Sequence, residues 1–104
     1  MFNVSHLDKK YHYNYALKES VLGVFSIKHL NKKNPFEVVN FINLFIKSNQ
    51  WEWDSITYYN CKRIEFLIQE KLPSKITDKK EIYYWLVNNW KRFYFSSFNN
   101  ISLN

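Results

Sequence analysis

Glycine and cysteine are almost missing from this chain of 104 residues, which contains one of each. Phosphate-cradling loops of the Walker or dinucleotide-binding type need several glycines, so enzymes that hold nucleotides in such loops are excluded. The lone cysteine, Cys61, cannot form an internal disulfide, which is typical of proteins in a reducing compartment. It falls on the apolar face of a predicted helix, where a thiol usually serves as a small buried hydrophobic group.

Long apolar runs are missing as well. The longest uncharged, mainly apolar run extends from Val38 to Ile46, and Asn40 and Asn43 interrupt it. No segment reaches the roughly 18 apolar residues that indicate a membrane span, and the first ten residues lack the apolar core of a secretory signal. We therefore expect no membrane partner and a cytoplasmic location.

Metal-ligand spacing is not recognisable in the chain. The histidines His6, His12 and His29 are not placed near Cys61 or near a pair of carboxylates, whereas zinc sites need four ligands in characteristic spacing. We predict no metal, no cofactor and no catalytic residue, and at most a local hydrogen bond between His6 and Asp8. A small nuclease without a known motif, built from His12 with lysines and tyrosines, is the enzymatic alternative.

Arginine is scarce, with two residues against 13 lysines, although the net charge is +6. A strongly basic small domain is typical of proteins that bind an anionic partner, nucleic acid first. Arginine is the residue preferred for bidentate contacts with phosphate and guanine, so its scarcity weakens the case for nucleic acid. The excess of lysine, asparagine, isoleucine, phenylalanine and tyrosine also indicates an AT-rich gene, whose codon bias by itself raises the number of lysines. The charge is therefore a weaker indication of nucleic-acid binding than its size suggests.

Helical patterning dominates what the chain does contain. Asn34 as N-cap, Pro35 at the first helical position and Glu37 at the third predict a helix start. The apolar residues that follow recur at helical spacing until near Ser48, and Asn40, Asn43 and Lys47 lie on the opposite side. These apolar residues are Val38, Phe41, Ile42, Phe45 and Ile46.

Two more helices follow the same logic. Asp54 is the predicted N-cap of the second, with Trp53 as a hydrophobic staple, and Pro73 ends it. Asp78 and Glu81 are predicted to begin the third helix, with the same spacing as Asn34 and Glu37 in the first. In the second helix, Lys62, Glu65 and Gln69 are predicted to face water. In the third helix, Asn89 is a polar residue that falls on the apolar stripe. The predicted core positions are Ile56, Cys61, Ile64, Leu67, Ile68 and Leu72 in the second helix, and Ile82, Trp85, Leu86 and Phe93 in the third.

The N-terminal third is less regular. The pattern from Tyr15 to Leu30 favours a helix despite Gly23, while the alternation from Val24 to Leu30 would also suit a strand. We predict one domain over residues 1–104, in which 1–14 and 96–104 are loose or docking tails. The expected class is mainly α: a small bundle of three helices whose N-terminal segment adds a fourth helix or short strands.

Aromatic residues make up 20% of the chain, more than so small a core needs to bury. Trp is enriched at interface hot spots, and the linker tryptophan Trp51 has no assigned place inside the bundle. The third helix is also aromatic on its outer side, with a positive rim. The predicted partner-binding residues are Trp51, Glu52, Tyr84, Asn88, Lys91, Arg92 and Phe95.

A second set of residues is typical of single-strand nucleic-acid binding, in which bases stack on aromatic rings beside positive charges. In an extended segment the tyrosines that follow Lys9 and Lys10 would share one face; the alternative is that one or two of these rings cover the core. This set is Lys9, Lys10, Tyr11, Tyr13, Tyr15, Lys32 and Lys33. Arg63, near Tyr59 and Phe66 on a helix flank, is expected to form a cation–aromatic surface patch.

Together these features favour a small non-enzymatic binding protein, of the kind encoded by phages and mobile elements. Anti-CRISPR, anti-restriction and immunity proteins are of this functional type, and they dock on a host protein or nucleoprotein complex. The alternatives are a basic helical domain that binds DNA or RNA and, second, a small nuclease. No helix-turn-helix pattern is convincing, because the connection from Leu72 to Asp78 is long and lacks glycine.

Overall fold

The computed structural model describes residues 1–17, 28–49 and 55–90. These ranges contain three α-helices: α1 (Pro35–Ser48), α2 (Ser55–Phe66) and α3 (Lys79–Asn89). Two short 3-10 turns precede them, η1 (Val4–His6) and η2 (Lys9–Tyr11), and the π-helical turn η3 (Leu67–Lys71) continues α2 directly. The predicted mainly α class is confirmed. The predictions for Trp53, Asp54, Phe93 and the tail 96–104 lie outside the described residues, as does the side chain of Ile56.

Helix α1 begins as its sequence predicts. The Asn34 side chain accepts hydrogen bonds from the backbone N–H groups of Phe36 at 3.0 Å and Glu37 at 3.3 Å. The buried carboxylate of Glu37 in turn accepts from the backbone N–H of Asn31 and from the Asn34 amide, both at 3.3 Å. The five apolar residues of the predicted stripe are all buried.

Helix α3 also begins at its predicted cap. Asp78 accepts hydrogen bonds from the backbone N–H groups of Lys80 at 2.8 Å and Glu81 at 3.2 Å. Ile82 and Leu86 are buried, as predicted. Asn89 is half-buried on this side, and its amide donates to the carbonyl of Trp85 at 2.8 Å, so a polar group on the stripe is satisfied within the helix.

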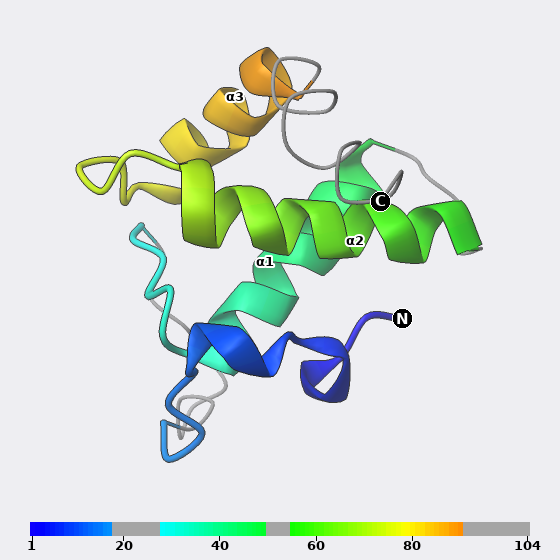
Figure 1. Cartoon of the computed structure of the whole chain (residues 1–104). Helices are drawn as coiled ribbons and strands as arrows, with labels where there is room; N and C mark the ends of the chain where they lie inside the picture. Colours follow the sequence, from blue (N-terminus) through cyan, green and yellow to red (C-terminus); the bar gives the residue numbers. More distant parts are fainter. Residues whose placement is uncertain (18–27, 50–54, 91–104) are drawn as a thin grey trace.

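Helix α2 is the centre of the fold. Figure 1 shows it between α3 and the N-terminal segment, with α1 crossing it. All six residues from Arg63 to Ile68 are buried, which requires cover on every side of the helix. The prediction that Glu65 faces water is therefore wrong, since Glu65 is 1% exposed; Lys62 and Gln69 are half-buried and hydrogen-bonded to the chain.

The cover over this polar side of α2 is the N-terminal segment, which docks on the bundle. Phe2, Leu7 and Tyr13 are buried in the core. The backbone N–H of Asp8 donates to the Glu65 carboxylate at 2.9 Å, and Lys62 Nζ donates to the carbonyl of His6 at 2.7 Å. Of the two options for residues 1–14, the docking tail is the one observed.

The helix predicted from Tyr15 to Leu30 is wrong at both of its described ends. Residues 14–17 form a turn in which the backbone N–H of Leu17 donates to the carbonyl of Asn14 at 3.2 Å. Residues 28–30 pair with the segment before α3: the backbone N–H of Leu30 donates to the carbonyl of Thr77 at 2.9 Å, and His29 forms an antiparallel bridge with Asp78. The described residues show only this isolated bridge and no strand here. The rest of the alternative strand from Val24 to Leu30 lies outside the described ranges, as do residues 18–27 as a whole.

Within the described ranges, no helix combines the length and the apolar character needed to cross a bilayer.

One hydrophobic core joins the elements of the fold. The buried apolar residues are Phe2, Leu7, Tyr13, Leu30, Val38, Phe41, Ile42, Phe45, Ile46, Cys61, Ile64, Phe66, Leu67, Ile68, Leu72, Ile82 and Leu86.

Candidate functional site

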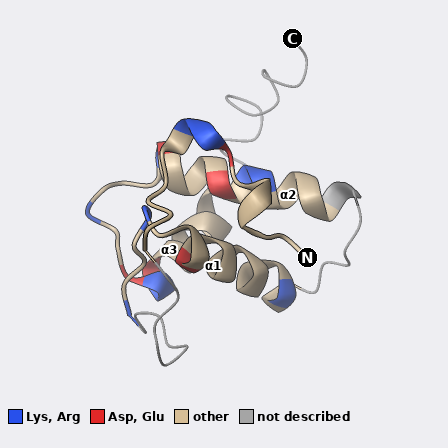
Figure 2. Cartoon of the chain, turned by 90° about the horizontal axis from the view of Figure 1, so that it is seen from below, with Lys and Arg blue, Asp and Glu red and all other residues tan. Residues whose placement is uncertain are grey.

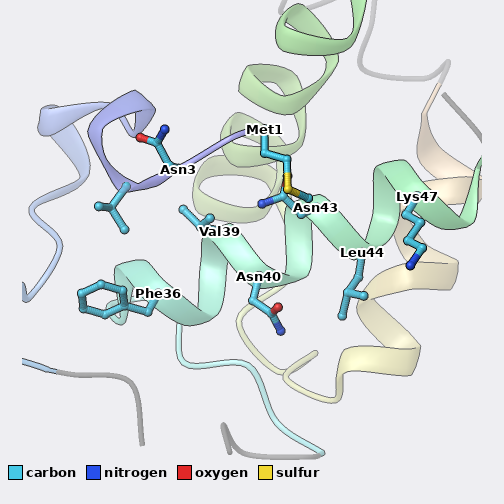
Figure 3. A pocket seen from close by; sticks show the side chains of 9 residues that line it. Met1, Asn3, Phe36, Val39, Asn40, Asn43, Leu44 and Lys47 are labelled. Carbon is cyan, nitrogen blue, oxygen red and sulfur yellow. The ribbon is translucent and has the colours of Figure 1, made fainter. Parts of the chain in front are cut away.

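The outer side of α1, turned away from the core, carries a hollow of about 530 Å³. Figure 3 shows the side chains of α1 that line it, with the start of the chain at one side. We call this feature the α1 hollow. It is lined by Met1, Asn3, Val4, Phe36, Val39, Asn40, Asn43, Leu44 and Lys47.

The lining combines apolar surface with amides and one positive charge. Five of the nine lining residues are apolar, three are asparagines, and Lys47 is the lysine at the C-terminal turn of α1. Leu44 is 56% exposed, although it is a large aliphatic side chain. Asn43 donates its amide to the carbonyl of Phe2 at 2.9 Å and so attaches the start of the chain beside the hollow.

The residues of the α1 hollow were missed as a site at the sequence level. Positions 36, 39, 40, 43, 44 and 47 follow helical spacing and form a second stripe beside the buried one. The prediction from the sequence placed Asn40, Asn43 and Lys47 on a solvated face of the helix. It did not consider Phe36, Val39 and Leu44 as surface residues. The signal that could have found them is a helix with large apolar residues on two sides.

A second candidate site is assembled from the residues predicted to bind nucleic acid. Residues 9–15 and Lys32 and Lys33 are far apart in the sequence, and the structure brings them together. The backbone N–H of Asn14 donates to the carbonyl of Lys33 at 2.9 Å, and Lys33 Nζ donates to the carbonyl of Tyr11 at 3.1 Å. We call this set the tyrosine–lysine cluster: Lys9, Lys10, Tyr11, Tyr13, Tyr15, Lys32 and Lys33.

The three tyrosines of the cluster do not share one exposed face, so that expectation is corrected. Lys9–Tyr11 is a 3-10 turn and not an extended strand. Tyr13 is buried and donates its hydroxyl to Glu65, Tyr11 is half-buried and donates to Glu70, and Tyr15 is 52% exposed. Burial, together with these carboxylates, raises the pKa of Tyr11 and Tyr13.

The outer side of α3 is exposed where it is described. Tyr84 is 60% exposed and Asn88, one turn later, is also exposed. The Tyr84 ring packs edge-on against the Tyr83 ring, with centroids 5.7 Å apart. The other predicted partner-binding residues, Trp51, Glu52, Lys91, Arg92 and Phe95, lie outside the described residues.

Arg63 does not form the expected surface patch, because it is 2% exposed. Its guanidinium lies 3.9 Å from the centroid of the Trp90 ring, and Trp90 also stacks on Phe45. The sequence showed the aromatic residues near Arg63 in its own helix, while its cation–π partner comes from the end of α3. Arg63 is therefore part of the packing between α2 and α3.

Cys61 and His6 are engaged inside the fold. Cys61 is fully buried, and burial raises the pKa of its thiol to about 11, so the reactive thiolate is disfavoured. His6 Nδ1 accepts from the backbone N–H of Asn3 at 3.0 Å, and the hydrogen bonds of the described residues include none between His6 and Asp8. Among the described residues, no group of three or more His, Cys, Asp or Glu side chains is placed to hold a metal ion.

The described chain is thus a small, mainly α-helical domain with two surface sites, the α1 hollow and the tyrosine–lysine cluster. Comparison with protein-family models, with curated proteins and with solved structures found no match.

Proposed function

We propose that this chain is a small non-enzymatic binding protein that docks on a partner protein through the α1 hollow. The observation that carries the proposal is the composition of the hollow, which presents Phe36, Val39 and the exposed Leu44 on the outer side of a well-capped helix. Exposed apolar residues gathered into one patch are typical of protein–protein contact sites. A rigid helix that carries them reduces the entropy cost of docking.

The charges of the hollow indicate what the partner presents. No acidic residue lines it, and Lys47 stands at its end. Among the residues that the structure describes, eight lysines are exposed against two glutamates, so the described surface as a whole is also positive. A complementary partner offers apolar side chains to Val39 and Leu44, an acidic group to Lys47, and backbone or amide groups to the asparagines.

We further propose that this partner is a host protein or a nucleoprotein complex, with this chain acting as an accessory or antagonist of a mobile element. The support for this class is the small size, the AT-rich coding pattern and the apolar surface of the hollow. Anti-CRISPR, anti-restriction and immunity proteins are examples of the type.

A capture experiment with two matched variants tests the docking surface. The variants are Leu44→Glu, in the hollow, and Val87→Glu, on the outer side of α3, where the valine is 46% exposed. Each places the same charge on an exposed aliphatic position of a helix, so both should leave the far-ultraviolet circular dichroism spectrum unchanged. The tagged proteins are used to capture partners from host lysate, and a captured protein is then purified and its Kd measured directly.

We expect Leu44→Glu to weaken the purified complex at least tenfold while Val87→Glu binds like the wild type. If instead Val87→Glu is the variant that loses binding, the docking surface is the outer side of α3 near Tyr84 and Asn88, and the assignment to the α1 hollow is wrong. Binding that is unchanged in both variants, or no specific capture by the wild type, would overturn the proposal.

A further inference from the structure

The tyrosine–lysine cluster is a surface distinct from the α1 hollow, and its backbone is held in place by hydrogen bonds from three segments. Gln69 donates from its side chain both to the Tyr13 hydroxyl at 3.2 Å and to the carbonyl of Lys32 at 2.9 Å. Together with the bonds from Asn14 and Lys33 described above, this fixes residues 11–15 beside residues 32–33. The positions of the lysine backbones are therefore set before any ligand arrives, which reduces the ordering cost of binding.

Lys32 is the member of the cluster whose environment points most directly to an anion. Its side chain is half-buried, and desolvation lowers the pKa of its ammonium group. Within the described part of the chain, no carboxylate and no hydrogen-bond acceptor is paired with this ammonium, whereas Lys10 has Glu70 at 3.4 Å and Lys62 has Glu65 at 3.3 Å. A partly desolvated cation without a counter-charge is unfavourable, and a bound anion would relieve that cost.

The carboxylates around the cluster are already engaged by the protein. Glu65 is buried and accepts from Tyr13 and from the backbone of Asp8, while Glu70 accepts from Tyr11 and lies near Lys10. Asp8 caps η2 by accepting from the backbone N–H of Lys10 at 3.0 Å. The buried Glu65 is held by these internal donors, whereas the partly exposed Glu70 carboxylate offsets the charge of Lys10. Among the described residues, the cluster lysines without a carboxylate within ion-pair distance are Lys9, Lys32 and Lys33.

An exposed aromatic residue follows Asn14, whose backbone N–H is bonded to the carbonyl of Lys33. Tyr15 is 52% exposed, and its ring packs edge-on against the buried Tyr13 ring at a centroid distance of 6.3 Å. That contact orients the Tyr15 ring and leaves much of its surface open. A base can stack on such a ring while the adjoining phosphate meets a lysine, and base–aromatic stacking contributes about 1–3 kcal/mol per base.

From this geometry we propose that the tyrosine–lysine cluster binds single-stranded nucleic acid, with a phosphate at Lys32 and Lys33 and a neighbouring base stacked on Tyr15. Figure 2 shows the blue segments spread over the top and the left side of the view, several of them beside red segments, and one at the far end of α1. The backbone N–H of Lys79 donates to the carbonyl of Lys28 at 2.7 Å. This backbone contact brings the exposed Lys28 beside the start of α3, where the exposed Lys80 lies next to Asp78 and the exposed Glu81.

Fluorescence anisotropy with a labelled twelve-nucleotide oligothymidylate, its RNA counterpart and a duplex of the same length tests this proposal. The variants are Lys32→Gln and Tyr15→Ala, and the control is Lys47→Gln. Lys47 is an exposed lysine at the opposite end of α1 from Lys33, about 20 Å away along a helix of this length. Each titration is repeated across a range of salt concentrations, because contacts with phosphate weaken log-linearly as salt rises.

We expect Lys32→Gln to weaken single-strand binding at least fivefold and to lower the salt slope by about one contact. Tyr15→Ala should weaken it fivefold or more without changing the salt slope, since the ring contributes no charge. Lys47→Gln should change Kd less than twofold.

Several results would overturn the proposal. The first is the absence of binding to either strand at low salt, and the second is an equal loss in Lys32→Gln and Lys47→Gln. Duplex binding as tight as single-strand binding, with no effect of Tyr15→Ala, would show unspecific attraction of polyanions. Displacement of the strand by polyaspartate at an equal charge concentration would assign the cluster to an acidic protein instead. Lys47 lines the α1 hollow, so Lys47→Gln serves as a control for oligonucleotide binding alone. The docking test of the α1 hollow uses Leu44 and a captured protein, so it can fail without affecting these outcomes.

Discussion

Tyr13 donates its phenolic hydroxyl to the Glu65 carboxylate over 2.8 Å, and both side chains are buried. The same carboxylate oxygen accepts the backbone N–H of Asp8 at 2.9 Å, and Lys62 Nζ lies 3.3 Å from the other oxygen. One side chain of α2 therefore holds the N-terminal segment at two points. A buried carboxylate is costly unless it is paired and hydrogen-bonded, so this attachment is sensitive to the loss of any donor.

Replacing Tyr13 by Phe tests the value of the hydroxyl. The ring keeps its shape, while Glu65 loses one donor and Gln69 loses one acceptor. Hydrogen bonds to charged groups contribute about 1.5–3 kcal/mol, so we expect the free energy of unfolding to fall by about 2 kcal/mol in urea titrations followed by tryptophan fluorescence. Tyr15→Phe is the control, because that residue is exposed and should change stability by less than about 0.5 kcal/mol. Equal effects of the two variants would contradict this account.

Replacing Glu65 by Ala should be more damaging than the loss of one donor. It leaves the Tyr13 hydroxyl and the backbone N–H of Asp8 buried without their acceptor and creates a cavity beside α2, which together cost about 3 kcal/mol or more. Hydrogen exchange should show that the amide of Asp8 loses its protection, while the amide of Glu81, capped by Asp78, changes only with global stability. A matched variant is Glu70→Ala, whose carboxylate is partly exposed and should cost less than about 1 kcal/mol. Retained protection at Asp8 would show that the segment docks by its apolar residues alone.

Local sequence signals were sufficient for two helices. Asn34 and Asp78 each sit at the start of an apolar pattern, and both accept the free N–H groups of the first turn as predicted. These signals operate within a few residues, so they can be recognised without knowing the rest of the fold.

The surroundings of α2 and of the two sites could not be predicted in the same way. Glu65 has the pattern of a solvated residue, and its burial depends on Tyr13, which lies 52 positions away. Arg63 is covered by Trp90, and the α1 hollow exists only because Met1 and Val4 lie against α1. Periodicity indicates which residues of a helix are apolar, but it does not show which polar residues a distant segment will cover. The role of the tyrosine–lysine cluster in binding stays a prediction, and the burial of Tyr13 within it came from this same covering.

The contact between Arg63 and Trp90 provides a test of the packing between α2 and α3. In Trp90→Leu, the guanidinium loses an aromatic face at 3.9 Å, and Phe45 loses the ring that stacks on it. A desolvated cation–π contact contributes about 2 kcal/mol, so we expect unfolding to become easier by about 2–3 kcal/mol in urea. The exposed Tyr84→Leu, on the same helix, should stay within about 0.5 kcal/mol of the wild type. If Trp90→Leu unfolds at the same urea concentration as the wild type, the contact adds nothing to stability.

The buried Cys61 thiol should make the free energy of unfolding depend on pH in alkaline solution. Burial raises its pKa from an ordinary value of 9.0 to about 11. Between these values the unfolded chain has released the thiol proton and the folded chain still holds it, so the folded state binds more protons and stability falls as pH rises. The contribution is complete below pH 9 and lost by about pH 11, with a limit of roughly 3 kcal/mol because one pKa unit corresponds to about 1.4 kcal/mol. Tyr11 and Tyr13, whose pKa values are also raised, add to the decline above their ordinary value of 10.0.

Cys61→Ala separates the thiol from the tyrosines. This variant should be less stable than the wild type at pH 8 because of the cavity it leaves, and the difference should narrow between pH 9 and pH 11 as the wild type alone loses the thiol contribution. Urea unfolding at half-unit steps of pH measures both curves. If the two curves remain parallel across this range, the thiol is accessible to solvent in the folded chain. A thiol-specific reagent checks the same point at pH 8, where the buried Cys61 should react only at the rate at which the fold opens.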